Sequence, residues 1–271
     1  MSDQESPSRQ SGTENLSKGF SGLTGKRAVV TGAGGGLAQA TAMRFAAEGV
    51  KMALVDLNLD GAKAATEKVN AAGGQAIALR ADVTNAASVK NMFAEAAEYM
   101  GGIDILITCA GGFTVYGDFE DLQEDDWDRV IALNLKSVFL CCQAIIPYMK
   151  AGGWGRIVNL GSAAGRSMNG GKAPAHYGTA KAGVSMLTQH VAKDTARFGI
   201  TANTVTPSTT KTQRVLNLLT PEITEDFIRV TPVGYIAEPE DIVGLIVFLS
   251  SDDARYITGA TYDVNGGRLM M

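Results

Sequence analysis

The sequence predicts an α/β protein, a single domain with a doubly wound parallel sheet of about seven strands and helices on both faces. Three observations support this prediction. Short apolar segments alternate with helical ones along most of the 271 residues, a pattern typical of a parallel sheet with both faces covered. A glycine-rich turn, residues 32–36, joins the first apolar segment to the first helical one. The second apolar segment ends in an acidic residue, Asp56.

The individual elements follow in order along the chain. The expected strands are apolar runs at residues 27–31, 51–56, 75–80, 103–108, 155–160, 201–205 and 261–264. The expected helices cover the segment after the glycine turn as far as residue 47, and then about residues 59–72, 86–100, 126–150, 177–197 and 240–249. No composition shift or internal repeat divides the chain. We therefore expect one folded domain over residues 24–271, preceded by a flexible polar tail over residues 1–23.

Composition argues against several classes of protein. Hydrophobic residues make up 45% of the chain and charged residues 19%, which is typical of a globular protein. The net charge of −4 and the lack of a basic stripe argue against a nucleic-acid partner. No apolar run is expected to span a membrane, and the tail lacks the apolar core of a secretory signal. The three cysteines show neither disulfide nor metal-ligand spacing, so no metal site is predicted. We expect a cytoplasmic protein without a membrane partner.

The glycine turn predicts a binding site for the phosphates of a dinucleotide. Gly32 and Gly36 let the backbone pass close to a pyrophosphate, and the following helix offers free N–H groups and a positive dipole end. Asp56 stands at the interval where a carboxylate accepts hydrogen bonds from the adenosine ribose. Such a carboxylate repels a 2′-phosphate, and neither the turn nor Leu57 supplies a basic side chain. The pattern is that of a Rossmann fold and favours NAD. A plain tight turn and a strand-end aspartate are the alternative interpretation.

Tyr177 and Lys181 form a candidate acid/base pair. They lie four residues apart in a segment with helical periodicity, so their side chains share one face of the helix. A nearby positive charge favours the phenolate, and we expect Lys181 to lower the pKa of Tyr177 from its usual value of about 10. A Tyr and a Lys at this spacing also occur by chance, so the pair indicates an acid/base unit only together with the other motifs of the chain.

The motifs lie in order on the predicted fold: Thr31-Gly32-x-x-x-Gly36-x-Ala38, Asn134, Ser162 and Tyr177-x-x-x-Lys181. Together they resemble the single-domain short-chain dehydrogenase/reductase (SDR) family over about residues 22–271. The resemblance implies a catalytic set of Asn134, Ser162, Tyr177 and Lys181. In this set the tyrosine exchanges a proton with the alcohol or ketone, and the serine donates to the substrate oxygen. The lysine binds the nicotinamide ribose, and the asparagine anchors a water in a proton relay.

The same resemblance implies a set of cofactor contacts. They are Gly32, Gly36, Leu37, Asp56, Asp82, Val83, Ala110, Gly111, Tyr177, Lys181, Pro207 and Thr212. The sequence departs from the family pattern in two segments. Thr108 and Cys109 replace two asparagines, which puts the usual side-chain contacts between strands in doubt. Ser208 replaces a glycine, which leaves the geometry of its loop open.

Three segments are expected to frame the substrate: residues 112–118, 163–175 and 208–231. The third is rich in apolar residues and is expected to form a mobile lid. Its composition favours a cyclic or steroid-like alcohol, with a sugar-type polyol as the other candidate. Lys172, Lys211 or Arg214 could instead meet an anionic group, as in a sugar acid, and solvated surface charge is the alternative interpretation of these residues. His176 is expected to be a pocket wall or surface residue. Cys109 has no identifiable partner base and is not expected to be a nucleophile.

The sequence therefore predicts an NAD-dependent oxidoreductase that interconverts a secondary alcohol and a ketone, with Tyr177 as the acid/base. One alternative is an NADPH-dependent 3-oxoacyl thioester reductase, against which Asp56 argues. The other is a non-catalytic dinucleotide-binding sensor, against which the complete catalytic set argues. The expected partners are a small-molecule alcohol or ketone and further copies of the chain. The resemblance implies a homotetramer, with a dimer as the alternative, built from the helices at about 126–150 and 177–197.

Overall fold

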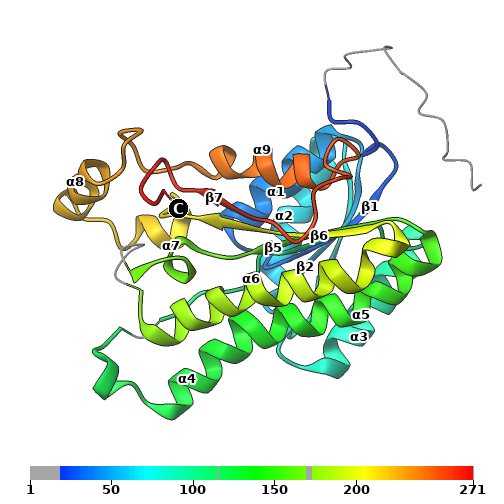
Figure 1. Ribbon diagram of the computed structural model, residues 1–271. Coiled ribbons are helices and arrows are strands. Elements are labelled where there is room, and N and C mark those ends of the chain that lie inside the picture. Colours follow the sequence, from blue (N-terminus) through cyan, green and yellow to red (C-terminus); the bar gives the residue numbers. More distant parts are fainter. Residues whose placement is uncertain (1–18, 115, 169–172, 271) are drawn as a thin grey trace, which may run out of the picture.

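The centre of the molecule is a seven-stranded parallel sheet, which confirms the expected fold class. The computed structural model describes residues 19–114, 116–168 and 173–270. The strand order is β3-β2-β1-β4-β5-β6-β7 (Figure 1). The strands are β1 (Arg27–Thr31), β2 (Lys51–Asp56), β3 (Gln75–Arg80), β4 (Ile105–Thr108), β5 (Gly155–Leu160), β6 (Ile200–Pro207) and β7 (Thr261–Val264). The chain reverses its direction of travel across the sheet between β1 and β4, and doubly wound sheets bind ligands at the carboxyl ends of such strands.

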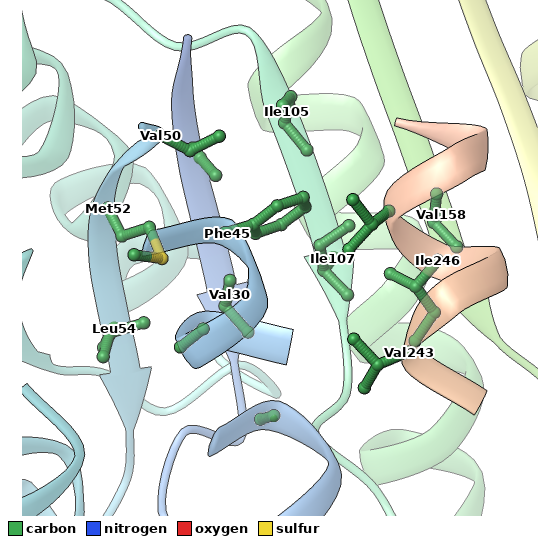
Figure 2. Packing of buried hydrophobic residues seen from close by; sticks show 14 of the residues in the cluster. Val30, Phe45, Val50, Met52, Leu54, Ile105, Ile107, Val158, Val243 and Ile246 are labelled. Atoms are coloured by element: carbon green, nitrogen blue, oxygen red, sulfur yellow. The ribbon is translucent and has the colours of Figure 1, made fainter. Parts of the chain in front are cut away.

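Helices cover both faces of the sheet. One face carries α1 (Gly36–Ala47), α2 (Leu59–Ala71) and α9 (Pro239–Leu249), and the other carries α3 (Ala86–Met100), α5 (Ser137–Gly152) and α6 (Ala175–Thr195) (Figure 1). Successive strand residues point to opposite faces. Val30 and Ile107 pack with Phe45 of α1 (Figure 2), whereas their neighbours Val29 and Leu106 pack under α3 and α5. Because both faces are buried, the strands are continuous apolar runs, and the sequence pattern could predict them.

The helix expected at residues 126–150 extends over Glu124–Gly152. It comprises α4 (Glu124–Ile131), a π-helical turn (Ala132–Lys136) and α5. By length and composition this helix could cross a membrane, so the sequence holds one candidate of membrane-spanning length where none was expected. Buried residues such as Val138 and Ile145 pack it against the sheet, and a core helix passes the same test of composition.

The described part of the expected tail is folded, so the predicted domain boundary at residue 24 is too late. Leu23 is 1% exposed, and the Phe20 ring lies 5.8 Å from that of Phe248 on α9. The Ser21 hydroxyl donates a hydrogen bond to Asp253. The apolar residues of this segment complete the α1/α9 layer. Residues 1–18 of the expected tail lie outside the described residues.

The lid segment extends beyond the carboxyl edge of the sheet (Figure 1). It contains α7 (Gln213–Leu216) and α8 (Pro221–Arg229). Thr220 caps α8 by accepting a hydrogen bond from Ile223 N at 3.3 Å. The C-terminal turn after β7 lies against this segment, because Val233 N donates to Gly266 O at 3.1 Å. The chain end therefore forms part of the same region as the lid.

Two departures from the family pattern leave the fold intact. The Thr108 hydroxyl donates to Asn159 Oδ1 on β5 at 2.9 Å, and the Asn159 amide donates to Thr188 on α6 at 2.9 Å. Side-chain contacts between strands are thus kept with a threonine in the place of an asparagine. Ser208 N donates to Val264 O at 3.2 Å, so the loop after β6 is tied to β7.

Candidate active site

The glycine turn provides a cradle at the N-terminus of α1. Gly32 has a φ of +72°, and a Cβ there would lie 2.7 Å from Ala110 N, so another residue would be strained and would clash. The N-cap of α1, Gly35, provides no side-chain cap, which leaves the first N–H groups of the helix available to a ligand. These features suit the phosphates of a dinucleotide. The turn lines a cavity of about 410 Å³, which we call the glycine-loop cavity.

Asp56 lies beside this turn at the end of β2. Its carboxylate accepts hydrogen bonds from Gly34 N and Asn58 N, both at 2.9 Å. A Cβ on Gly34 would lie 3.1 Å from Asp56 Oδ2, so glycine permits this close approach. Arg80, which pairs with Asp56 in the register of β2 and β3, donates from Nε to Leu57 O at 3.3 Å. A basic side chain therefore lies near the carboxylate, although not in the turn itself.

Most of the expected cofactor contacts line the glycine-loop cavity. They are Gly32, Gly36, Leu37, Gly111, Tyr177, Lys181, Pro207 and Thr212. Asp56, Asp82, Val83 and Ala110 do not line it; they follow or end the neighbouring strands β2, β3 and β4. Asp82 accepts from Thr84 N at 2.9 Å and from the Thr84 hydroxyl at 2.7 Å, which fixes the turn after β3.

Ser162 and Tyr177 come together because the turn after β5 packs directly on the backbone of α6. A Cβ on Gly165 would lie 2.6 Å from backbone atoms of α6, and one on Gly178 would lie 3.1 Å from Ala164 O. Glycine at both positions therefore allows backbone-to-backbone contact. Ser162 accepts from Ala164 N at 3.2 Å, and its side chain hydrogen-bonds Tyr177.

Lys181 lies one helical turn after Tyr177, with its Nζ 5.8 Å from the centre of the tyrosine ring. The side chain is buried, and Nζ donates to Leu160 O at 2.7 Å. Gly111 lies next to it, since a Cβ there would be 3.3 Å from Lys181 Nζ and 2.8 Å from Asn134 Oδ1. The expected catalytic residues thus surround one point at the end of β5.

Asn134 occupies the π-helical turn, and its amide is bonded to the backbone. Oδ1 accepts from Gly112 N at 2.7 Å, while Nδ2 donates to Gly112 O and to Val130 O, each at 2.8 Å. The side chain is fully buried. One amide proton therefore holds the loop after β4 and the other bonds the preceding turn of the helix, while one Oδ1 lone pair remains for the expected water.

The pKa of Tyr177 beside Lys181 shifts in the direction opposite to the one expected. Burial raises the pKa of Tyr177 above its ordinary value, and the hydrogen bond from Ser162 and the charge of Arg214 oppose this rise only in part. Burial also lowers the pKa of Lys181 to about 8. The prediction that Lys181 brings the pKa of Tyr177 below its usual value is wrong for this structure, because the loss of solvent outweighs the neighbouring charge.

Cys109 and His176 are the two other residues that the sequence offered as candidates at the site. Burial raises the pKa of the Cys109 thiol to about 12, so it is protonated at neutral pH, in line with the expectation that it is no nucleophile. His176 is 0% exposed and its Nδ1 accepts from Tyr177 N at 2.8 Å. It is therefore neither a pocket wall nor a surface residue, as was expected, but a core residue at the start of α6.

A larger cavity of about 730 Å³ lies next to the glycine-loop cavity, and we call it the lid cavity. The three predicted substrate segments all contribute to it, through Phe113, Ala164, Ala173, Val215, Leu218, Leu219, Ile223 and Phe227 among others. Ser162 and Tyr177 line both cavities. The candidate acid/base therefore lies where a bound cofactor and a substrate in the lid cavity would meet.

Lys211 and Arg214, two of the basic residues expected at the substrate, do not line the lid cavity. Lys211 forms an ion pair with Glu238 at 2.6 Å, and Arg214 lines the glycine-loop cavity. Lys172 lies outside the described residues. Instead, Arg268 and Arg229 line the lid cavity. Sequence reasoning missed Arg268, although it directly follows the Asn-Gly-Gly motif of the C-terminal turn.

Comparisons with known proteins agree with this geometry. A family model described as enoyl-(acyl carrier protein) reductase matches residues 32–268. A relative from Sphingobium indicum, 2,5-dichloro-2,5-cyclohexadiene-1,4-diol dehydrogenase LinX, is 36% identical over 90% of this chain and 96% of its own. The chain belongs to the short-chain dehydrogenase/reductase family.

Further relatives place this SDR protein among oxidoreductases. 3-Oxoacyl-[acyl-carrier-protein] reductase FabG of Staphylococcus epidermidis is 37% identical over 90% of this chain and 99% of its own. The crystal structure of levodione reductase superposes with a TM-score of 0.86 at 32% identity, covering 90% of this chain and 98% of that one. The protein is thus an SDR oxidoreductase acting on alcohol- or ketone-type substrates, and its family binds a nicotinamide dinucleotide.

Proposed function

We propose that this SDR protein is an NAD-dependent dehydrogenase that interconverts a secondary alcohol and a ketone on a ring-sized carbon skeleton. The observation that carries the proposal is the position of Ser162 and Tyr177 in the walls of both cavities. A cofactor at the glycine loop and a substrate under the lid would meet at these two side chains. The nicotinamide, when bound, would accept hydride from the alcohol carbon or donate it to the ketone carbon.

The chain's own residues would provide the proton and its path. In oxidation, Tyr177 as phenolate takes the proton of the substrate hydroxyl; in reduction, the phenol returns it to the ketone oxygen. Ser162 donates to the same oxygen, where negative charge develops. Asn134 holds the loop after β4 and offers its free lone pair to a water that reaches Lys181. Because burial raises the pKa of Tyr177, the phenol is protonated at neutral pH, which suits reduction; oxidation should speed up as pH rises.

Replacing Tyr177 with Phe tests whether the protein is an enzyme. Loss of a general acid/base lowers kcat by about 10²–10⁴-fold, whereas the glycine loop is untouched and NAD binding should persist. Stopped turnover with unchanged NAD affinity, measured by calorimetry, supports the role of Tyr177. A wild-type protein that binds NAD tightly and turns over no alcohol would instead support the alternative of a non-catalytic sensor.

The preference for NAD rests on Asp56. Its carboxylate lies at the glycine turn through the bond from Gly34 N, where it would accept from the ribose hydroxyls and repel a 2′-phosphate. Changing Asp56→Asn should lower kcat/KM with NAD⁺ and raise the NADP⁺/NAD⁺ ratio, while the matched change Asp60→Asn on α2 should alter neither. A wild-type enzyme that prefers NADP⁺ would refute this assignment.

Arg80 is the observation that favours the NADPH-dependent 3-oxoacyl thioester reductase. It lies beside Asp56 on β3, and a basic side chain there could meet a 2′-phosphate. The relative named FabG is by name a 3-oxoacyl-[acyl-carrier-protein] reductase. Assays with NADPH and a 3-oxoacyl thioester, in wild type and in Arg80→Gln, distinguish this function: activity that depends on Arg80 would support it over the NAD-dependent one.

The substrate class is proposed from the lid cavity. Its volume lies within the range of about 300–1,000 Å³ found for small-molecule sites, and its lid side is lined by aliphatic residues such as Leu218, Leu219 and Ile223. The relative LinX acts, by its name, on a cyclohexadiene diol. A screen of cyclic, steroid-like and polyol substrates with NAD⁺ tests the class: turnover confined to open-chain polyols would refute a ring-sized skeleton.

We also propose a homotetramer built on α5 and α6. Phe139 of α5 is 44% exposed and Met186 of α6 is 56% exposed, and exposed apolar side chains on long helices favour association. Light scattering after size exclusion gives the mass directly. Phe139→Glu and Met186→Glu should lower it, and a monomeric wild type would refute the proposal.

A further inference from the structure

Arg268 occupies the wall of the lid cavity, in the turn that follows β7. Its Nη1 is buried and has no hydrogen-bond partner among the described residues. The guanidinium lies over the ring of Phe227 on α8, with Cζ 4.9 Å from the ring centre. The ion pairs of the described residues do not include Arg268. A charged donor is therefore held against an aromatic face without an anion.

The backbone fixes Arg268 in this place. Asn265 Oδ1 accepts from Gly267 N at 3.0 Å, its Nδ2 donates to Leu269 O at 3.0 Å, and its carbonyl accepts from Arg268 N at 3.2 Å. Gly266 has a φ of +63°, and a Cβ there would lie 2.6 Å from the side chain of Val233. Only glycine allows the turn to pack this closely under the lid, so the backbone of Arg268 is held in place and its guanidinium lies over Phe227.

A partly buried guanidinium whose Nη1 has no partner is unfavourable by itself. Burial lowers the pKa of Arg268, which means that the charged form is penalised, and arginine cannot relieve the penalty by releasing its proton. The acid on the same cavity, Asp226, is paired with Arg229 at 2.8 Å, and both of these side chains are more than 70% exposed. Asp226 therefore forms its ion pair with Arg229 and not with Arg268. A buried donor without a partner calls for an explanation, and in the wall of a cavity a ligand that completes the bonding is one.

We propose that the substrate carries a carboxylate and that Arg268 binds it, while the alcohol or ketone carbon lies at Ser162 and Tyr177. This inference rests on the proposed function, because it places a second group of the same substrate. A carboxylate is favoured over a phosphate, since one guanidinium against an apolar wall neutralises a single charge. The planar fork of arginine matches two carboxylate oxygens and would select the acid over its ester or amide.

A binding experiment tests the inference without turnover. The full-length protein, saturated with NAD⁺, is titrated by calorimetry with cyclohexanecarboxylate and with the neutral isostere cyclohexanecarboxamide. Removing a charge-assisted hydrogen bond weakens binding by roughly 10- to 150-fold. We expect wild type to prefer the carboxylate by about that factor and Arg268→Met to bind both probes equally weakly. Arg268→Lys should keep part of the preference, and Arg255→Gln, an exposed control of equal charge change, should keep all of it.

Thermal stability, probe binding by wild type and substrate kinetics distinguish a failure of this inference from a failure of the proposed function. Arg268→Met should melt no lower than wild type, because it replaces a partly buried guanidinium with an unpaired Nη1 by an apolar side chain. A large loss of stability would indicate a structural role and overturn the inference. Equal binding of the two probes by wild type would also overturn it. With cyclic hydroxy acids and their methyl esters as substrates, Arg268→Met should raise KM for the acid and leave the ester unchanged. Carboxylate binding that depends on Arg268, with no turnover of either substrate, would refute the proposed function alone.

Discussion

The contact between the Ser162 turn and α6 makes Gly165→Ala an informative perturbation. The added Cβ would lie 2.6 Å from Ala182 N and from Lys181 C, where ordinary contacts begin at 3.4 Å. The turn and the helix must therefore separate by at least about 0.8 Å. Both neighbours are backbone atoms, so no flexible side chain can absorb the change. Overpacking of this kind costs about 1–3 kcal/mol of stability, and a misplacement of about 1 Å at a reacting group lowers the rate by roughly 10²-fold.

The assay compares kcat, NAD affinity and Tm in Gly165→Ala and in a matched control. Gly244→Ala lies in α9 with nothing within 4 Å of its added Cβ, and alanine should stabilise that helix by about 1 kcal/mol. We expect Gly165→Ala to lose most of kcat and several degrees of Tm, with NAD affinity kept. If Gly165→Ala retained wild-type kcat and Tm, the idea that this glycine sets the distance between Ser162 and Tyr177 would be wrong.

Other perturbations test the surroundings of the pair. Asn134→Ala removes three hydrogen bonds to Gly112 and Val130. It should lower the free energy of unfolding by about 1–3 kcal/mol, which denaturant melts measure. It should also raise KM for the cofactor and for the substrate, which steady-state kinetics measure. Burial lowers the pKa of Lys181 to about 8 in the folded protein, from its ordinary value of 10.5. The unfolded chain therefore binds more protons between these two values, and stability should rise with pH across that window. Lys181→Met should abolish this contribution, and melts between pH 7 and 10.5 show whether it does. The Cys109 thiol, with a pKa of about 12, should resist iodoacetamide at pH 8, and Cys109→Ala should keep full kcat; rapid alkylation with loss of activity would contradict this.

Local patterns account for how much of the fold could be predicted. The apolar runs of the strands and the glycine turn at Gly32 are signals within short segments, and the structure confirms them in order. The tail boundary failed because this segment packs on α9, more than 200 residues away, through the contact of Phe20 with Phe248. The helix across residue 134 is two residues longer at each end than expected: it begins at Glu124 and runs to Gly152, where Gly153 caps it in the left-handed conformation.

The candidate site could likewise be predicted from the sequence only in part. The spacing of Tyr177 and Lys181 placed them on one helical face, but the direction of the Tyr177 pKa could not be read from that spacing. It depends on how much solvent the lid and the turn after β5 exclude, which is a property of the packed structure. Likewise, Lys211 and Arg214 have the right charge for an anionic substrate, and only their contacts show that they lie outside the lid cavity.

The sequence by itself determined the parallel sheet, the glycine cradle and the identity of the residues around Tyr177, because each follows from periodicity or from spacing within one element. The tertiary structure decided which distant residues share a cavity. Arg268 reaches the lid because Gly266 and Gly267 turn the chain back under α8, and its partner ring, that of Phe227, is supplied by a segment 41 residues earlier. Contacts between such segments depend on the whole packed chain, and no local pattern encodes them.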